Sequence, residues 1–262
     1  MEQLFVIKIG GNVIDDPQFL QSFLHDFSAI PQKKILVHGG GKIATRIGEQ
    51  LGIVSNYVDG RRITDENTID LVTMVYGGLV NKKMVARLQS VHCNAIGLTG
   101  ADADTARAVK RPVKEIDYGF VGDLHSSLMQ AASWETFLAN GLVPVVAPLT
   151  HDGKGQMLNT NADTMASMIA VTLSARYKVR LVFCFEKKGV LEDPADDNTV
   201  IPLITAQNYR VLLQQNRLSG GILPKIDNAF KAISTGVAEV LIGDAKDLLQ
   251  NTGSAMRGTL IK

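Results

Sequence analysis

The 262-residue chain contains few cysteines, almost no net charge and no long apolar run. Cys93 and Cys184 lie in apolar segments and form no CxxC pair, which argues against a disulfide framework and a cysteine zinc site. The 27 Lys and Arg residues nearly balance the 26 Asp and Glu residues, which argues against a coat for nucleic acid or a membrane surface. No segment approaches the ~18 apolar residues of a membrane span, and the start lacks a signal-peptide pattern. We therefore expect a cytoplasmic protein with no nucleic-acid or membrane partner.

Short apolar segments alternate with segments of helical periodicity, which is typical of a parallel α/β sheet whose strands are covered by helices on both faces. We expect strands at residues 4–9, 34–38, 93–98, 143–147, 179–185 and 239–242. We expect helices at residues 17–29, 64–91, 134–140, 162–173, 206–214 and 225–235, the first three capped by Asp16, Thr64 and Ser133. Segment 106–122, with its basic residues and YGFVGD turn, predicts an antiparallel excursion.

The chain has no internal repeat and no linker rich in proline, glycine or serine. Any two lobes are therefore connected through continuous structure. We place the boundary near Ala175, where a predicted helix gives way to a predicted strand. This boundary divides the chain into an N-terminal lobe of residues 1–175 and a C-terminal lobe of residues 176–262.

Three glycine-rich segments stand out: KIGGN at 8–12, HGGGK at 38–42 and SGG at 219–221. Glycines after a strand let backbone N–H groups approach an anion, and a following helix adds its positive end. Ligands of open parallel sheets bind at the carboxyl ends of the strands. Each segment alone is explained equally well as a tight turn. Two of them at strand ends, each with a lysine, favour phosphate binding.

Three common nucleotide-binding signatures are absent. A P-loop needs a glycine five residues before Gly41, where Leu36 stands, and Lys42 is followed by Ile43 rather than Ser or Thr. The stretch HGGGKIAT has no third glycine in the register of the dinucleotide fingerprint, which argues against an oxidoreductase. The DFG and HRD elements of protein kinases are missing as well. The glycine-rich segments thus indicate phosphate-binding machinery of another class.

Segment 159–163 (NTNAD) directly precedes an apolar helix. Asn161 or Asp163, taken alone, is explained as a helix cap. Two asparagines and a carboxylate within this one segment are more than a single cap requires. We therefore expect polar side chains here to have a role beyond capping.

Together, KIGG and HGGG resemble the opening of the amino acid kinase family. The order of GRRIT at 60–64, NK at 81–82, YGFVGD at 118–123, NTNAD at 159–163 and GGILPK at 220–225 resembles the branch that phosphorylates an N-acylated glutamate. The resemblance covers essentially the whole chain. It implies a three-layer αβα sandwich with an open, mainly parallel central sheet. It also implies transfer of the γ-phosphoryl group of ATP, with Mg²⁺, to the γ-carboxylate of the acylglutamate, the second step of arginine biosynthesis.

The resemblance also assigns roles to residues. The N-terminal lobe would hold the acylglutamate and the C-terminal lobe the nucleotide. The implied catalytic residues are Lys8, Lys225, Asp163 and Gly11. The implied acylglutamate contacts are Gly40, Gly41, Arg62, Asn159 and Asn161. The implied nucleotide contacts are Gly10, Glu186, Gly189, Val190, Leu191, Leu218 and Ser219. No residue is implied as a direct ligand of the metal.

Physical chemistry is consistent with these roles. A carboxylate with a pKa of about 4.3 is already ionised at neutral pH, so the nucleophile needs no general base. The difficulty is repulsion between anions, about 4 kcal/mol for two unit charges ~4 Å apart at an effective dielectric constant of about 20. Lysines such as Lys8 and Lys225 offset that repulsion, and a lysine at a glycine-rich strand end is poorly explained as a surface residue. Arg62 suits the substrate's α-carboxylate. We expect His38 to form structural hydrogen bonds and Trp134 to pack in the core.

Two positions depart from the family pattern. Glu186 stands where the family usually has Asp, which puts the nucleotide contacts in doubt. Arg61 stands where the family usually has an apolar residue. Arg61, or another basic residue such as Lys110, would suit an extra negative charge on the acyl group, as in N-succinylglutamate. The alternative is that Arg61 simply points to water.

The first predicted strand starts too early to leave room for the N-terminal helix that links arginine-inhibited members into hexamers. We therefore expect a homodimer without arginine feedback, with segment 64–91 as its interface.

Two alternatives to an acylglutamate kinase stay open. One is another family enzyme acting on a small carboxylate or carbamate. The other is a regulator that binds ATP and an amino acid without catalysis, which the presence of Lys8, Asp163 and Lys225 disfavours.

Overall fold

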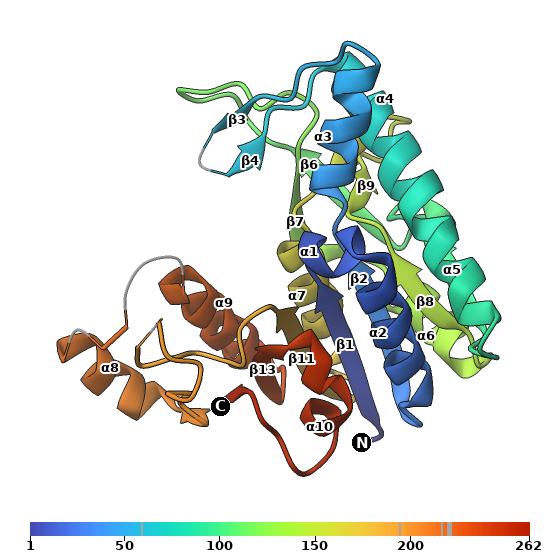
Figure 1. Ribbon diagram of the computed structural model, residues 1–262. Coiled ribbons are helices and arrows are strands. Elements are labelled where there is room, and N and C mark those ends of the chain that lie inside the picture. The colour runs from blue at the N-terminus through green and yellow to red at the C-terminus, as the bar shows by residue number, and fades with distance from the viewer. Residues whose placement is uncertain (59, 194, 216, 219–221) are drawn as a thin grey trace.

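A mainly parallel sheet forms the centre of the molecule in the computed structural model, which describes residues 1–58, 60–193, 195–215, 217–218 and 222–262 (Figure 1). The eight strands have the order β12-β14-β13-β11-β1-β2-β8-β5, and only β13 and β14 pair antiparallel. Their bounds are Leu203–Ile204, Thr259–Ile261, Glu239–Asp244, Lys178–Phe185, Gln3–Ile9, Lys33–His38, Val143–Val146 and Ala95–Leu98. All six predicted strands are present in this sheet.

Helices cover both faces of the sheet, so the predicted three-layer sandwich is confirmed (Figure 1). One face packs against α6 (Ala131–Ala139), α7 (Ala162–Leu173), α8 (Ala206–Gln214) and α9 (Leu223–Ser234). The other packs against α1 (Gly11–Asp15), α2 (Pro17–Ala29), α3 (Gly41–Gln50), α4 (Glu66–Val72), the π-helix η1 (Thr73–Val80), α5 (Asn81–Gln89) and α10 (Leu248–Thr252). The described residues also include two short 3₁₀ segments, η2 (Asp102–Asp104) and η4 (Ala245–Asp247). None of the described helices is both long and apolar enough to cross a membrane.

The predicted helix caps had mixed outcomes. Asp16 caps α2 as predicted, since its carboxylate accepts from the backbone N–H groups of Gln18 and Phe19. Thr64 was wrong as the cap of the next helix, because the neighbouring Asp65 accepts from the N–H of Thr68 instead. Thr64 is buried and pairs with Gly119 in a β-bridge. The predicted helix over 64–91 is present, but its middle third widens into the π-helix η1.

Ser133 was also wrong as a helix cap. Helix α6 begins two residues earlier, at Ala131, and Ser133 lies in its first turn. The Ser133 hydroxyl donates to the carbonyl of Ala103 instead. Trp134 is fully buried as predicted, and its indole N–H donates to the carbonyl of Thr105.

A second, smaller sheet stands at the carboxyl edge of the first and has the order β10-β9-β6-β7. Its strands are Met157–Asn159, Leu149–His151, Ala106–Lys110 and Gly122–Met129. Strands β6 and β7 pair antiparallel, which confirms the excursion predicted for segment 106–122. A two-stranded ribbon, β3 (Tyr57–Val58) and β4 (Arg61–Arg62), projects beside this sheet (Figure 1).

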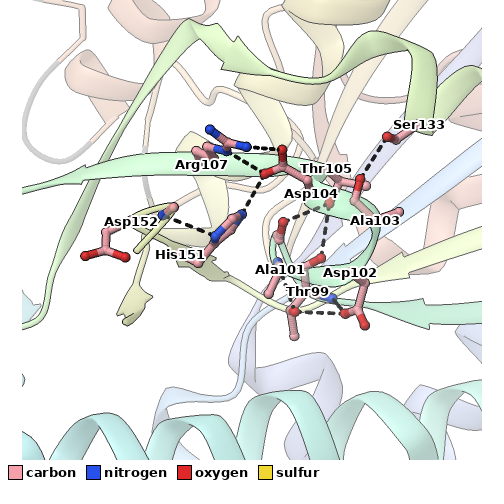
Figure 2. Close-up of polar contacts among 12 residues, drawn as sticks. Thr99, Ala101, Asp102, Ala103, Asp104, Thr105, Arg107, Ser133, His151 and Asp152 are labelled. Carbon is pink, nitrogen blue, oxygen red and sulfur yellow. Dashed lines mark hydrogen bonds and ion pairs between the residues drawn. The ribbon is translucent and has the colours of Figure 1, made fainter. Parts of the chain in front are cut away.

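The turn between β5 and β6 is backbone-strained. Ala103 and Asp104 have φ values of 50° and 54°, a left-handed conformation that side chains with a Cβ rarely adopt. The Asp104 carboxylate accepts from Arg107 Nε at 2.7 Å and from His151 Nε2 at 2.9 Å (Figure 2). These bonds connect the turn to β6 and β9 of the smaller sheet. Tertiary contacts therefore stabilise the strained backbone conformation.

Candidate active site

The register of the central sheet brings the two glycine-rich loops together. Strands β1 and β2 are parallel, with Ile9 opposite His38, so both loops leave the same edge of the sheet side by side. Strand β11 lies on the other side of β1, with Cys184 opposite Ile9. The loop after β2 runs directly into α3, whose N-terminal N–H groups face the carboxyl edge. This is the edge at which ligands bind in open α/β sheets.

A cavity of about 670 Å³ opens over these loops. Its lining includes these residues predicted as catalytic or ligand-binding: Lys8, Gly10, Gly11, Gly40, Gly41, Glu186, Gly189, Val190, Leu191 and Lys225. A Cβ at Gly10 or Gly11 would meet no protein atom closer than 3.8 Å, and one at Gly41 would meet none within 4 Å. Packing within the protein therefore does not require glycine at these three positions. Close approach of a ligand to the backbone does explain it.

Gly40 differs from the other glycines of this loop. A Cβ there would lie 2.8 Å from Cδ1 of Tyr76, a side chain of η1 that is buried. The π-helix is thus packed against the glycine loop itself. A larger residue at this position would push the loop away from η1 or into the cavity.

Lys8 and Lys225 line the larger cavity, and Asp163 lies beside them. Lys8 Nζ lies 2.8 Å from Asp163 Oδ1, although the two residues come from β1 and α7. Lys225 Nζ lies 3.5 Å from the ring centroid of Phe185, and Lys8 Nζ lies 5.6 Å from the same centroid. The structure therefore brings the two lysines predicted to stabilise the phosphoryl group close to the carboxylate predicted to orient them.

The two lysines are held in a partly dehydrated environment. Burial lowers the pKa of Lys225 and the charge of Lys8 lowers it further, while Asp163 acts in the opposite direction. Lys8 itself is only 9% exposed. Cations in such surroundings interact strongly with a polyanion because little water screens them.

A second cavity of about 250 Å³ adjoins the first across Gly39–Gly41. It is lined by every residue predicted to contact the acylglutamate: Gly40, Gly41, Arg62, Asn159 and Asn161. Arg61, Tyr57 and Tyr76 also line it. All of its lining residues precede residue 165, so this cavity is built entirely from the first part of the chain.

Arg62 is buried and fixed by protein contacts. Its Nη2 donates to the carbonyl of Gly41 and to Thr45 Oγ1, both at 2.9 Å, and its Nη1 donates to Ser55. The guanidinium stacks 4.8 Å from the ring centroid of Tyr57. Its Nε is buried and has no hydrogen-bond partner among the residues that the structure describes. Arg62 therefore holds the glycine loop in place and keeps one donor unused.

The two asparagines of the NTNAD segment have different roles. Asn161 caps α7, because its side-chain oxygen accepts from the N–H groups of Asp163 and Thr164. The Asn159 side-chain amide donates to Thr64 Oγ1 at 3.0 Å, which connects the NTNAD and GRRIT segments. Asp163 is not the cap of α7, so its carboxylate is left for Lys8.

Arg111 is a site residue that was not predicted. It lines the smaller cavity, with Nη2 2.5 Å from Asp123 Oδ1 and the guanidinium 5.1 Å from the Tyr118 ring centroid. Within the described part of the chain, its Nη1 is buried without a hydrogen-bond partner. The basic residues of segment 106–122 were visible in the sequence, but no pattern there distinguished Arg111. Lys110, the basic residue named beside Arg61, stacks on the Phe120 ring.

The predicted nucleotide contacts are only partly gathered at the larger cavity. Leu218 is not among its lining residues and is buried in the core. Ser219, Gly220 and Gly221 lie outside the described residues. Arg217 and Ile222, which were not predicted, also line the cavity. Arg217 is ion-paired with Glu192 at the rim.

His38 has the structural role that was predicted. It is fully buried, its Nδ1 lies 2.6 Å from the Gly39 carbonyl, and its Nε2 accepts from the Asn81 side-chain amide. Burial lowers the pKa of His38 to about 4, so the ring is neutral at physiological pH. The pair His38–Asn81 connects the glycine loop to α5.

Sequence comparison provides the deciding observation. The sequence model described as the amino acid kinase family matches residues 3–244. The chain belongs to the amino acid kinase family. It is 52% identical to the acetylglutamate kinase of Phocaeicola vulgatus, covering 98% of this chain and 99% of that protein. It is 54% identical to that of Cytophaga hutchinsonii (95% and 94% covered) and 38% identical to that of Methanopyrus kandleri (96% and 99% covered).

Solved structures agree with membership of the amino acid kinase family. The crystal structure of smu.665 from Streptococcus mutans UA159 superposes with a TM-score of 0.76 at 28% identity, covering 99% of this chain and 98% of that one. The N-acetylglutamate synthase of Neisseria gonorrhoeae superposes with a TM-score of 0.82 at 21% identity, covering 99% of this chain and 59% of that one. The latter likeness concerns the fold alone.

Proposed function

We propose that this chain transfers the γ-phosphoryl group of ATP to the γ-carboxylate of an N-acyl-L-glutamate, producing an acyl phosphate for arginine biosynthesis. The observation that carries the proposal is the convergence of Lys8, Asp163 and Lys225 beside the larger cavity, which adjoins the smaller cavity at Gly39–Gly41. The larger cavity, with its open glycine backbone, suits the nucleotide. The smaller, arginine-rich cavity suits a substrate with two carboxylates.

In this proposal the protein contributes positioning and charge rather than proton transfer. The acceptor carboxylate is already ionised at neutral pH, so no side chain has to remove a proton. Lys8 and Lys225 offset the repulsion between acceptor and phosphoryl group, and Asp163 fixes the ammonium group of Lys8. Backbone N–H groups of Gly11 and Gly40 would hold phosphoryl oxygens through dipoles that need not reorganise.

Mg²⁺ fits this donor set as a companion of the nucleotide. Among the described residues, no group of three or more His, Cys, Asp or Glu side chains could enclose a metal ion. Mg²⁺ commonly binds through substrate phosphates and water with few protein carboxylates, and Glu186 is the acidic side chain that lines the larger cavity. When bound, the metal neutralises charge on the β- and γ-phosphates.

The test is ADP production with MgATP and, in parallel, N-acetylglutamate, N-succinylglutamate, free glutamate and aspartate. We expect turnover only with an acylated glutamate. No ADP production with either acyl compound, or turnover only with a free amino acid, would contradict the proposal. ATP hydrolysis without any acceptor would serve as the background to subtract.

N-succinylglutamate is a second candidate for the acyl substrate, favoured by the guanidinium groups of the smaller cavity. Arg61, Arg62 and Arg111 line it, with Asp123 as the one acidic lining residue. An acetylated substrate brings one carboxylate besides the acceptor, whereas a succinylated one brings two. Arg111 Nη1, which is buried and has no partner among the described residues, is a donor suited to the second of these carboxylates.

Two variants distinguish which arginine serves the acyl group. Arg61→Leu and Arg111→Leu are each assayed with both acyl substrates. If Arg111 contacts a succinyl carboxylate, Arg111→Leu lowers kcat/KM for succinylglutamate at least tenfold more than for acetylglutamate. The same substrate preference in wild type and both variants would remove both arginines from the explanation.

We further propose that residues 1–175 form the acylglutamate lobe and residues 176–262 the nucleotide lobe. The lining of the smaller cavity supports the first assignment, and Glu186, Gly189 and Leu191 in the larger cavity support the second.

We also propose a homodimer through the helical segment 66–89. Its apolar residues Met74 and Leu79 are 57% and 37% exposed. Light scattering of wild type and Met74→Asp would test this, a monomeric wild type being the contrary result.

A further inference from the structure

We propose that a groove between α7 and α9 is a second small-molecule site, which takes an aromatic carboxylate and competes with ATP for Lys225. The groove has a volume of about 340 Å³, shares Phe185 and Lys225 with the larger cavity and has no glycine-loop residue among its lining residues. Its residues come from α7, β11, the middle of β7, and α9 with its C-cap Thr235. Of these elements, β7 and α7 have no residue lining the larger cavity.

The floor of the groove is apolar and flat. Phe183 and Phe185 stack with ring centroids 6.2 Å apart and an angle of 21° between their planes. Met168 and Val171 of α7 form one wall, and Ala232 of α9 belongs to the other. A planar ring fits such a floor, since stacking and removal of apolar area from water both favour it.

The charges of the groove favour an anion. Lys225 and Lys231 line it, and neither forms an ion pair within the described part of the chain. Asp163 is the one acidic lining residue, and Lys8 already holds it at 2.8 Å. An incoming carboxylate would therefore meet two unpaired ammonium groups above an aromatic floor. Ser167 and Asn228 add hydrogen-bonding groups at the rim.

Shared residues connect the groove to catalysis. Phe185 and Lys225 line both the groove and the larger cavity. Lys225 Nζ lies 3.5 Å from the Phe185 ring centroid. The ammonium group is therefore next to the ring that lines both the groove and the larger cavity. A carboxylate bound in the groove would draw Lys225 away from the nucleotide phosphates. The competition with ATP rests on the proposed function, whereas binding itself does not.

Calorimetric titration of the whole chain with 2-naphthoate tests binding without any turnover. We expect saturable binding of 2-naphthoate and at least fivefold weaker binding of the neutral 2-naphthamide. Lys231→Gln, a surface substitution outside the catalytic cluster, should weaken 2-naphthoate binding about fivefold. Met168→Trp, which fills the groove, should abolish it. Lys154→Gln removes an exposed lysine elsewhere and should leave binding unchanged.

Absence of 2-naphthoate binding would overturn the proposal. Equal affinity in wild type, Lys231→Gln and Met168→Trp would also overturn it, because the ligand would then occupy another site. Lys231→Gln alone keeps the test decisive if Met168→Trp does not fold. In the ADP assay, 2-naphthoate should lower kcat by drawing Lys225 away from the phosphoryl group, with KM for ATP changed only a few-fold, and Lys231→Gln should reduce that effect. An inactive protein that still binds 2-naphthoate would contradict the proposed function and leave the groove site standing.

Discussion

At the scale of single residues, Lys225 shows how environment adapts a side chain to its proposed role. Burial lowers the pKa of Lys225, so the ammonium group loses its proton at a lower pH than a lysine in water. Catalysis requires the charged form. Activity should therefore fall as pH rises through this lowered value, below the ordinary lysine pKa of about 10.4.

Lys225→Arg makes this prediction specific. An arginine stays charged across the accessible pH range, so residual activity of Lys225→Arg should lack the alkaline limb in the pH profile of kcat/KM. Lys231→Arg is the matched control and should keep the limb of the wild type. An alkaline limb at the same pH in Lys225→Arg and wild type would show that another group titrates.

His38 makes a prediction about stability. Its pKa is about 4 in the folded protein and about 6.5 in the unfolded chain, so the unfolded chain binds more protons between these values. Stability should rise with pH across this window, and His38 contributes about 3 kcal/mol to that rise. Urea unfolding at pH 4.5 and 6.5 should show a smaller pH effect in His38→Asn than in wild type. Equal pH effects in the two proteins would contradict the assignment.

At the scale of elements, the strained turn between β5 and β6 depends on Asp104. Aspartate and asparagine tolerate the left-handed conformation better than alanine, and Asp104 also accepts from Arg107 and His151 (Figure 2). Asp104→Ala loses both the tolerance of the left-handed conformation and the two side-chain hydrogen bonds. It should lower the free energy of unfolding by about 1–2 kcal/mol. Asp104→Asn keeps the backbone preference and should lose less. Equal losses, measured by urea unfolding, would show that the turn conformation does not matter.

Prediction from sequence succeeded where a local signal determined the element. Pro17 after Asp16 marks the start of α2, and doubly apolar segments mark the central strands. It failed where neighbours of similar chemistry compete, as when Asp65 rather than Thr64 caps α4. The π-helix η1 was not predicted, because its bulge against Gly40 depends on tertiary packing.

At the scale of the whole molecule, the site is assembled from distant parts of the chain. Lys8, Asp163 and Lys225 are far apart in sequence, and no spacing rule brings them together. The resemblance to the amino acid kinase family assigned them, and packing of α7 against both β1 and α9 brings them together. Arg111 escaped prediction because its place beside the cavity depends on the pairing of β6 with β7.

The central claim is that Lys225 stabilises the transferring phosphoryl group from the wall of the larger cavity. The most direct measurement is kcat of Lys225→Ala with MgATP and the acylglutamate that the wild type uses, alongside calorimetric affinity for ATP. We predict a loss of kcat of about 10²–10³-fold, the scale of removing one preorganised electrostatic contact, with ATP affinity changed only a few-fold. Near-normal turnover by Lys225→Ala would contradict the account.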